Sequence, residues 1–149
     1  MDLVGRKIQR EAGATAKAWL GSLKSLDAEL GRSQNADIKA LRAQLAQGVQ
    51  AVGDAVNFIV ESKDPRATFA GAVPFLKLMG IVCGGWQLAR SALIAQQRLS
   101  EGRGDKAFYE AKIKTARFYA DHVLTQGPAL RNTIVHGAAG VMALAEEQF

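Results

Sequence analysis

Residues 38–59 read IKALRAQLAQGVQAVGDAVNFI, and this stretch decides the fold. Its apolar residues recur three and four positions apart, which is the spacing of one face of an α-helix. Asn35 or Asp37 can cap the start of that helix. The helix should stop before Pro65, because the residue ahead of a proline is disfavoured in the helical conformation. The stretch therefore predicts a long helix with one buried face, formed by Ile38, Leu41, Leu45, Val49, Val52, Val56 and Ile59.

The same spacing extends in both directions along the chain. Upstream, one stripe ends at Gly31 and consists of Ala16, Trp19, Leu23, Leu26 and Leu30. Downstream, a short helical piece from Arg66 to Gly71 precedes a helix from about Val73 to Leu99, with Phe75, Leu78, Met79, Val82, Trp86, Ala89 and Leu93 inward. A fourth helix, capped by Asp105, directs Tyr109, Ile113, Ala116, Ala120 and Val123 inward. Gly127-Pro128 ends it, and a fifth presents Leu130, Ile134, Ala138, Val141 and Ala145. The sequence predicts an all-α protein, an antiparallel bundle of four to five helices.

Composition places the chain among folded globular domains. It has 149 residues, of which 48% are apolar and 22% charged, as expected for one domain with a continuous core. The single cysteine excludes an intramolecular disulfide and a cysteine-rich zinc site. The first residues lack the basic-then-apolar order of a secretory signal. We expect a cytoplasmic protein.

The net charge of +5 raises the possibility of nucleic-acid binding. The densest basic stretch comprises Arg98, Arg103, Lys106, Lys112, Lys114 and Arg117, but Glu101, Asp105 and Glu110 interrupt it. Domains that bind duplexes concentrate lysine and arginine on one face. Interleaved signs are typical of solvated helix faces, so the sequence predicts no nucleic-acid partner.

Residues that carry chemistry are few and scattered. His122 and His136 have no histidine or carboxylate partner at the spacing of a metal site. Cys83 lies in the most apolar predicted helix, where a small buried side chain is expected rather than a reactive thiolate. Residues 72–89 are apolar apart from Lys77 and Gln87, but they fall short of a membrane span and predict a buried central helix instead. We therefore predict no catalytic residue, no metal site and no transmembrane segment.

Several segments of the chain together resemble one family. They are DLVGRK (2–7), AVPFLKLMG (72–80), GGW (84–86), FYEAK (108–112), ARFYA (116–120) and EQF (147–149). Their order and spacing are similar to the C-terminal end of long bacterial acyl-CoA dehydrogenases, the acetyl-CoA dehydrogenase-like C-terminal domain. The resemblance covers nearly the whole chain.

That resemblance implies a fragment of a longer FAD-dependent enzyme. In the family, the catalytic glutamate lies in a Glu-Gly-Thr loop just upstream of the segment matched by residues 2–7, and several flavin contacts lie in the same region. No catalytic or FAD-binding residue therefore falls on this chain. The implied parent reaction is α,β-dehydrogenation of an acyl-CoA thioester, and acyl-CoA is the parent's substrate. Residues 1–31 would form an N-terminal helical segment, the end of the dehydrogenase core, and residues 35–149 the C-terminal helical bundle.

The implied partners are the dehydrogenase core of the same parent chain and further copies in a homo-oligomer. Trp19, Leu20 and Phe118 widen their apolar stripes and are candidates for the docking face. Two alternatives remain open. The chain could be a free-standing helical module for oligomerisation or partner docking, without enzymatic activity. The basic stretch from Arg98 to Arg117 could also bind anionic lipid or the phosphates of acyl-CoA.

Overall fold

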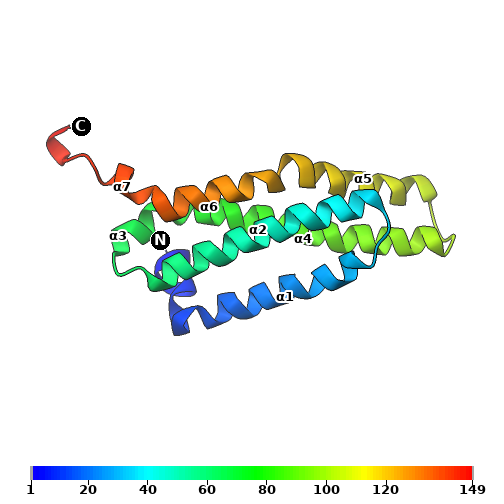
Figure 1. Cartoon of the computed structure of the whole chain (residues 1–149), viewed down its shortest axis with the longest axis horizontal. Helices are drawn as coiled ribbons and strands as arrows, with labels where there is room; N and C mark the ends of the chain where they lie inside the picture. Colours follow the sequence, from blue (N-terminus) through cyan, green and yellow to red (C-terminus); the bar gives the residue numbers. More distant parts are fainter. Residues whose placement is uncertain (1, 149) are drawn as a thin grey trace.

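The computed structural model describes residues 2–148, which contain helices and no strand (Figure 1). The longer helices are α1 (Ala14–Gly31), α2 (Ala36–Glu61), α4 (Ala72–Ser100), α5 (Lys106–His122) and α6 (Gly127–His136). Shorter pieces are α3 (Pro65–Ala70), α7 (Ala138–Val141), a π-helical turn η1 (Leu3–Ile8) and the 3-10 turns η2 (Arg10–Gly13), η3 (Leu124–Gln126) and η4 (Glu146–Gln148). The predicted all-α bundle is confirmed. Phe149, the last residue of the EQF segment, lies outside the described residues, as does Met1.

Side-chain caps fix the starts of two long helices. The Asn35 side chain accepts hydrogen bonds from the backbone N–H groups of Asp37, at 2.9 Å, and Ile38, at 3.3 Å. Asn35, rather than Asp37, is therefore the cap of α2. Asp105 caps α5 in the same way, accepting from the Ala107 N–H at 2.9 Å. Such caps satisfy donors that have no partner within the helix.

A tight loop folds α5 back along α4. Gly102 and Gly104 have φ values of +63° and +79°, a conformation that side chains with a Cβ rarely adopt. The two glycines let the chain reverse within a few residues. As a result α5 packs antiparallel along α4, the central helix, which also contacts α2 and α6 (Figure 1).

Helix α1 lies mainly along α2. Its buried stripe contains Leu20, Leu23, Leu26 and Leu30 with Ala16, whereas Trp19 is only half-buried. The loop between α1 and α2 is anchored, because the buried Ser33 hydroxyl donates to the Gln96 side chain of α4 at 2.5 Å.

The predicted fifth helix is wrong beyond His136. Ile134 is buried and Leu130 half-buried, but Val141 and Ala145 are exposed. Helix α6 ends at His136, and the following segment extends away from the bundle (Figure 1). Periodicity continues through this segment, but α3 is the main element that packs against α7, so most of the stripe has no surface to bury it.

The predicted buried central helix is correct for one face of α4 only. Phe75, Leu78 and Val82 are fully buried, whereas Val73 and Leu76 are exposed. By length and composition α4 is the one helix among residues 2–148 that could cross a membrane, and a third of its most apolar window is buried in this fold. The core helix of a bundle passes the same test, so this is weak evidence for a membrane span. Helix α4 therefore has a packed inner face and an uncovered outer face.

Candidate functional site

The two histidines lie apart on the surface. His122 ends α5 and stacks on Phe118, with ring centroids 4.3 Å apart. His136 ends α6 and is exposed. Within residues 2–148, no three histidine, cysteine, aspartate or glutamate side chains come together in a group that could hold a metal ion.

Cys83 lies on α4 near the Tyr119 side chain of α5. The thiol is half-buried rather than fully buried, and loss of contact with water raises its pKa above the ordinary value. The Tyr119 hydroxyl donates to the Ile81 carbonyl at 3.1 Å, and its pKa is raised by burial and by Cys83. Gly84 gives this hydroxyl its space, since a Cβ there would lie 2.5 Å from it. The arrangement holds α4 against α5 and disfavours a reactive thiolate.

The basic stretch from Arg98 to Arg117 is largely occupied by ion pairs. These join Arg98 and Arg103 to Glu101, Lys106 to Glu110, and both Lys114 and Arg117 to Asp37. Lys112 lies over the Phe108 ring. Because most of these cations already face a carboxylate, the stretch does not form a free basic patch for phosphates.

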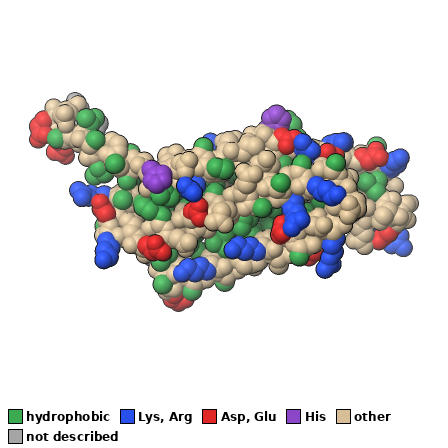
Figure 2. Space-filling view, in the orientation of Figure 1, with side chains coloured by type: hydrophobic (Ala, Val, Ile, Leu, Met, Phe, Trp, Pro, Cys, Tyr) green, Lys and Arg blue, Asp and Glu red, His purple; other side chains and the backbone are tan. Residues whose placement is uncertain are grey.

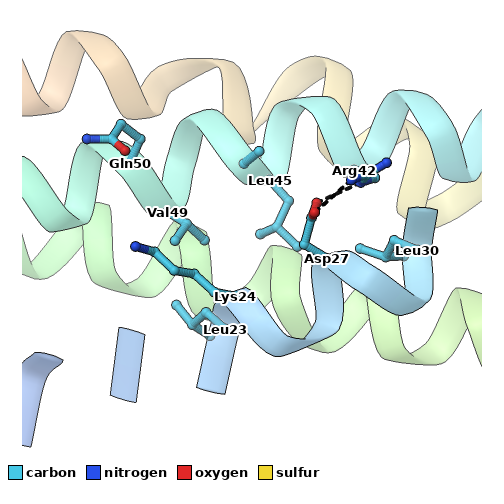
Figure 3. Close-up of a pocket in the computed structure, with 9 residues that line it drawn as sticks. Leu23, Lys24, Asp27, Leu30, Arg42, Leu45, Val49 and Gln50 are labelled. Carbon is cyan, nitrogen blue, oxygen red and sulfur yellow. Dashed lines mark hydrogen bonds and ion pairs between the residues drawn. The ribbon is translucent and has the colours of Figure 1, made fainter. Parts of the chain in front are cut away.

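A groove of about 300 Å³ runs between α1 and α2 (Figure 3). Its floor is formed by Leu23, Leu30, Leu45 and Val49. At one end the Arg42 guanidinium makes two hydrogen bonds of 2.7 Å to the two carboxylate oxygens of Asp27. This hydrogen bonding holds the pKa of Asp27 below its usual range. The groove is an apolar seam closed by a satisfied ion pair.

The face that carries this seam has mixed charges. Figure 2 shows acidic and basic side chains interspersed over it, with hydrophobic atoms visible between the helices. It therefore has neither a single sign of charge nor one continuous apolar patch.

The predicted docking residues do not form one surface. Leu20 is buried against the rest of the bundle, so its assignment to an open face is wrong. Trp19 is half-buried, and Phe118 is exposed on α5. Trp19 and Leu20 therefore do not form a wide exposed apolar surface, because Leu20 faces the inside of the bundle.

Helix α4 carries further exposed apolar residues that the sequence pattern did not predict to be exposed. Val73, Leu76 and Ile94 are 78%, 63% and 56% exposed. Gly80 lies between them, and a Cβ built on it would meet nothing within 4 Å. The sequence does contain a signal for this exposure: α4 has apolar residues outside the stripe that already forms its buried face. We refer to Val73, Leu76, Gly80 and Ile94 as the outer row.

Comparison with known proteins identifies the family. The family described as acetyl-CoA dehydrogenase C-terminal like matches residues 9–145. The chain therefore belongs to the acyl-CoA dehydrogenase C-terminal domain family, as its sequence resemblance predicts.

Two curated relatives are dehydrogenases of greater length. The 3-methylmercaptopropionyl-CoA dehydrogenase of Ruegeria pomeroyi is 36% identical over 89% of this chain and 23% of its own length. The broad-specificity linear acyl-CoA dehydrogenase FadE5 of Mycobacterium tuberculosis is 29% identical over 99% of this chain and 26% of its own length. The chain thus spans about a quarter of each of these relatives.

Proposed function

We propose that this chain is the C-terminal helical domain of a longer FAD-dependent acyl-CoA dehydrogenase, where it packs on the catalytic core and shapes oligomeric assembly. The family match over residues 9–145 carries the proposal. The lengths of the relatives support it, because each has about three quarters of its length outside the matched region.

The parent enzyme would convert an acyl-CoA thioester to its α,β-unsaturated form, with FAD as hydride acceptor. The groove between α1 and α2 is a poor match for a flavin. Its floor is leucine and valine, Asp27 pairs with the Arg42 guanidinium, and Lys24 and Gln50 are the other polar side chains that line it. A flavin diphosphate is bound by several converging N–H donors, as at a helix N-terminus, and the residues that line this groove do not provide such a set. We therefore place flavin, acyl-CoA and the catalytic base on the remainder of the parent. The domain itself would be non-catalytic.

We further propose a cytoplasmic homo-oligomer, with residues 1–31 closing the dehydrogenase core and residues 35–149 forming the added bundle. The η1 turn is packed into the bundle, because it contacts α3, α2 and α4 and its Val4 and Ile8 belong to the hydrophobic core. A preceding core would therefore meet this end of the bundle first.

The size of the native gene product tests the proposal. An antibody raised against this chain should detect a band several times heavier than 15.9 kDa in source cells. The purified heavy product should carry a flavin spectrum, whereas the 149-residue chain should not. A native band at 15.9 kDa would contradict the proposal.

A second candidate is a free-standing helical module that oligomerises or docks on a separate partner. The exposed outer row of α4 favours it, because such a surface is suited to a partner of any origin. This candidate requires a native band at 15.9 kDa and a defined oligomer at that chain length.

A further inference from the structure

Helix α4 has two apolar stripes on one helix. The inner stripe packs against α2, α5 and α6, while the side chains of the outer row, Val73, Leu76 and Ile94, are mostly exposed and Gly80 faces open space. Ile94 also lines a groove between α4 and α1. At 1.5 Å per residue, residues 73–94 span about 32 Å. The row is not continuous, because the exposed polar residues Gln87 and Ser91 lie on the same face between Gly80 and Ile94. Val73 and Leu76 form its more exposed end, and exposed apolar side chains grouped in this way are found at interaction surfaces.

Glycine at position 80 adds to this picture. A glycine inside a helix lowers helix stability relative to alanine, and here no atom of residues 2–148 lies where its side chain would be. By contrast, a Cβ on Gly85 would come within 2.8 Å of Leu124, so packing inside the chain accounts for that glycine. Gly21 of α1 and Gly53 of α2 also face open space, so Gly80 permits a close approach of another surface to the α4 backbone but does not by itself require one.

Two cations flank the outer row. Successive residues are about 100° apart around a helix, which places Lys77 and Arg90 each about 70° from the centre of the row, on opposite sides. Neither has a carboxylate within ion-pair distance in the described part of the chain. Arg90 lies over the Trp86 ring and donates to the Gln87 side chain. Arg90 also lines a groove between α4 and α1 that contains Glu29, but the two side chains do not form an ion pair.

The charge pattern discriminates between two occupants. Residues 72–100 contain Lys77, Arg90 and Arg98 but no aspartate or glutamate. A second copy docking across α4 by two-fold symmetry would bring the same cationic face against itself, and like charges at an interface are unfavourable. A different surface, apolar and bearing carboxylates, would match both the row and its cations.

The position of the chain start favours one such surface. Residues 3–8 contact α3, α2 and α4. Helix α3 leads directly into the start of α4, where Val73 and Leu76 are exposed. In the relatives, about three quarters of the polypeptide lies outside the region matched here. A core that precedes residue 3 would join the bundle near α3, at the end that carries Val73 and Leu76 (Figure 1).

We infer that the outer row of α4 docks on the dehydrogenase core of the same parent chain, against an apolar patch that presents carboxylates to Lys77 and Arg90. This inference rests on the proposed function and adds the face of the bundle and the chemistry of the partner surface. Docking buries Val73, Leu76 and Ile94 and brings the core close to the α4 backbone at Gly80.

The test uses the full-length gene product with a protease site inserted before Leu3. After cleavage, the released domain should co-elute with the flavin-bearing part in gel filtration. Leu76→Asp should weaken this association by about tenfold or more, the size of effect typical of a central interface residue. Phe118→Asp is the matched control, because Phe118 is 61% exposed on α5 and should leave association unchanged.

Charge-reversal variants test whether the partner surface presents carboxylates to the cations of α4. Lys77→Glu should weaken association, and the wild-type complex should weaken as salt is raised. Lys24→Glu, on the groove between α1 and α2, should have no effect. Circular dichroism of each released domain should match wild type, since Leu76 and Lys77 are exposed.

The outcomes separate the inference from the proposed function. Suppose the native product is a heavy flavoprotein. If Leu76→Asp does not weaken association of the cleaved domain, or if Phe118→Asp or Lys24→Glu releases it, the proposed docking face is wrong and the proposed function still holds. A cleaved domain that forms its own dimer, broken by Leu76→Asp, assigns the row to a second copy and also overturns it. A native product of 15.9 kDa overturns both.

Discussion

The two faces of α4 have similar apolar residues and opposite surroundings. On the inner face Phe75, Leu78 and Val82 are inaccessible to solvent, and Gly85 lies against Leu124. On the outer face Val73 and Leu76 are exposed, and Gly80 faces open space. Contacts within the chain account for the inner face completely. They do not account for the outer face, which is why we propose that it docks on the dehydrogenase core of the parent enzyme.

The largest expected contrast comes from truncating one residue on each face. Phe75→Ala should lower the free energy of unfolding by about 3–5 kcal/mol, because it leaves a cavity in the core. Val73→Ala should change it by less than about 0.5 kcal/mol, since the side chain is mostly in water. Urea unfolding followed by circular dichroism measures both. Equal losses would mean that the two faces are equally buried.

Gly85→Ala should destabilise the chain by about 1–3 kcal/mol through overpacking. The new Cβ would lie 2.8 Å from one methyl of Leu124 and 3.0 Å from the other. Leu124 is fully buried and has little room to move. An unchanged urea midpoint would show that α4 and η3 are packed more loosely than described.

Gly80→Ala should change the free energy of unfolding in the opposite direction and stabilise the chain. Nothing lies within 4 Å of the new Cβ, and alanine favours the helix over glycine by about 1 kcal/mol. The free energy of unfolding of the 149-residue chain should rise by this amount. In the cleaved full-length product the same change should weaken docking. A loss of stability in the 149-residue chain would contradict an open outer face.

The smallest effect concerns Cys83, between the two faces. Burial raises the pKa of its thiol, so at neutral pH less of it is thiolate than in an unfolded chain. Alkylation by iodoacetamide should be slower in the folded chain than in urea. Its rate should reach half-maximum at a higher pH when the chain is folded. Equal pH profiles would indicate a fully solvated thiol.

Periodicity in the sequence was sufficient for the helices and the inner core. Asn35, Asp105 and the glycines at 102 and 104 mark real helix boundaries. Two predictions failed for one physical reason. Leu20 is buried and Val141 exposed, because burial depends on which neighbour covers a stripe, and the spacing within a single helix does not contain that information.

The exposure of the outer row could not be predicted for the same reason. Residues such as Val73 and Phe75 are both apolar, and their spacing alone cannot say which one lies inside. The proposed function rests on the family match, because the histidines, the cysteine and the carboxylates of the chain form no recognisable catalytic pattern. The docking proposal depends on two structural facts that the sequence does not give: the exposure of the outer row and the absence of ion pairs at Lys77 and Arg90 in the described part of the chain.

The most direct test is a photocrosslink from the outer face in the full-length gene product. Benzoylphenylalanine in place of Leu76, and separately in place of Phe118 as a comparison, would be irradiated and the crosslinked peptides identified by mass spectrometry. We predict that position 76 crosslinks to residues outside this chain but within the same polypeptide, and that position 118 does not. Crosslinks from position 76 to a second copy of this chain, or crosslinks to the core from position 118 alone, would contradict the account.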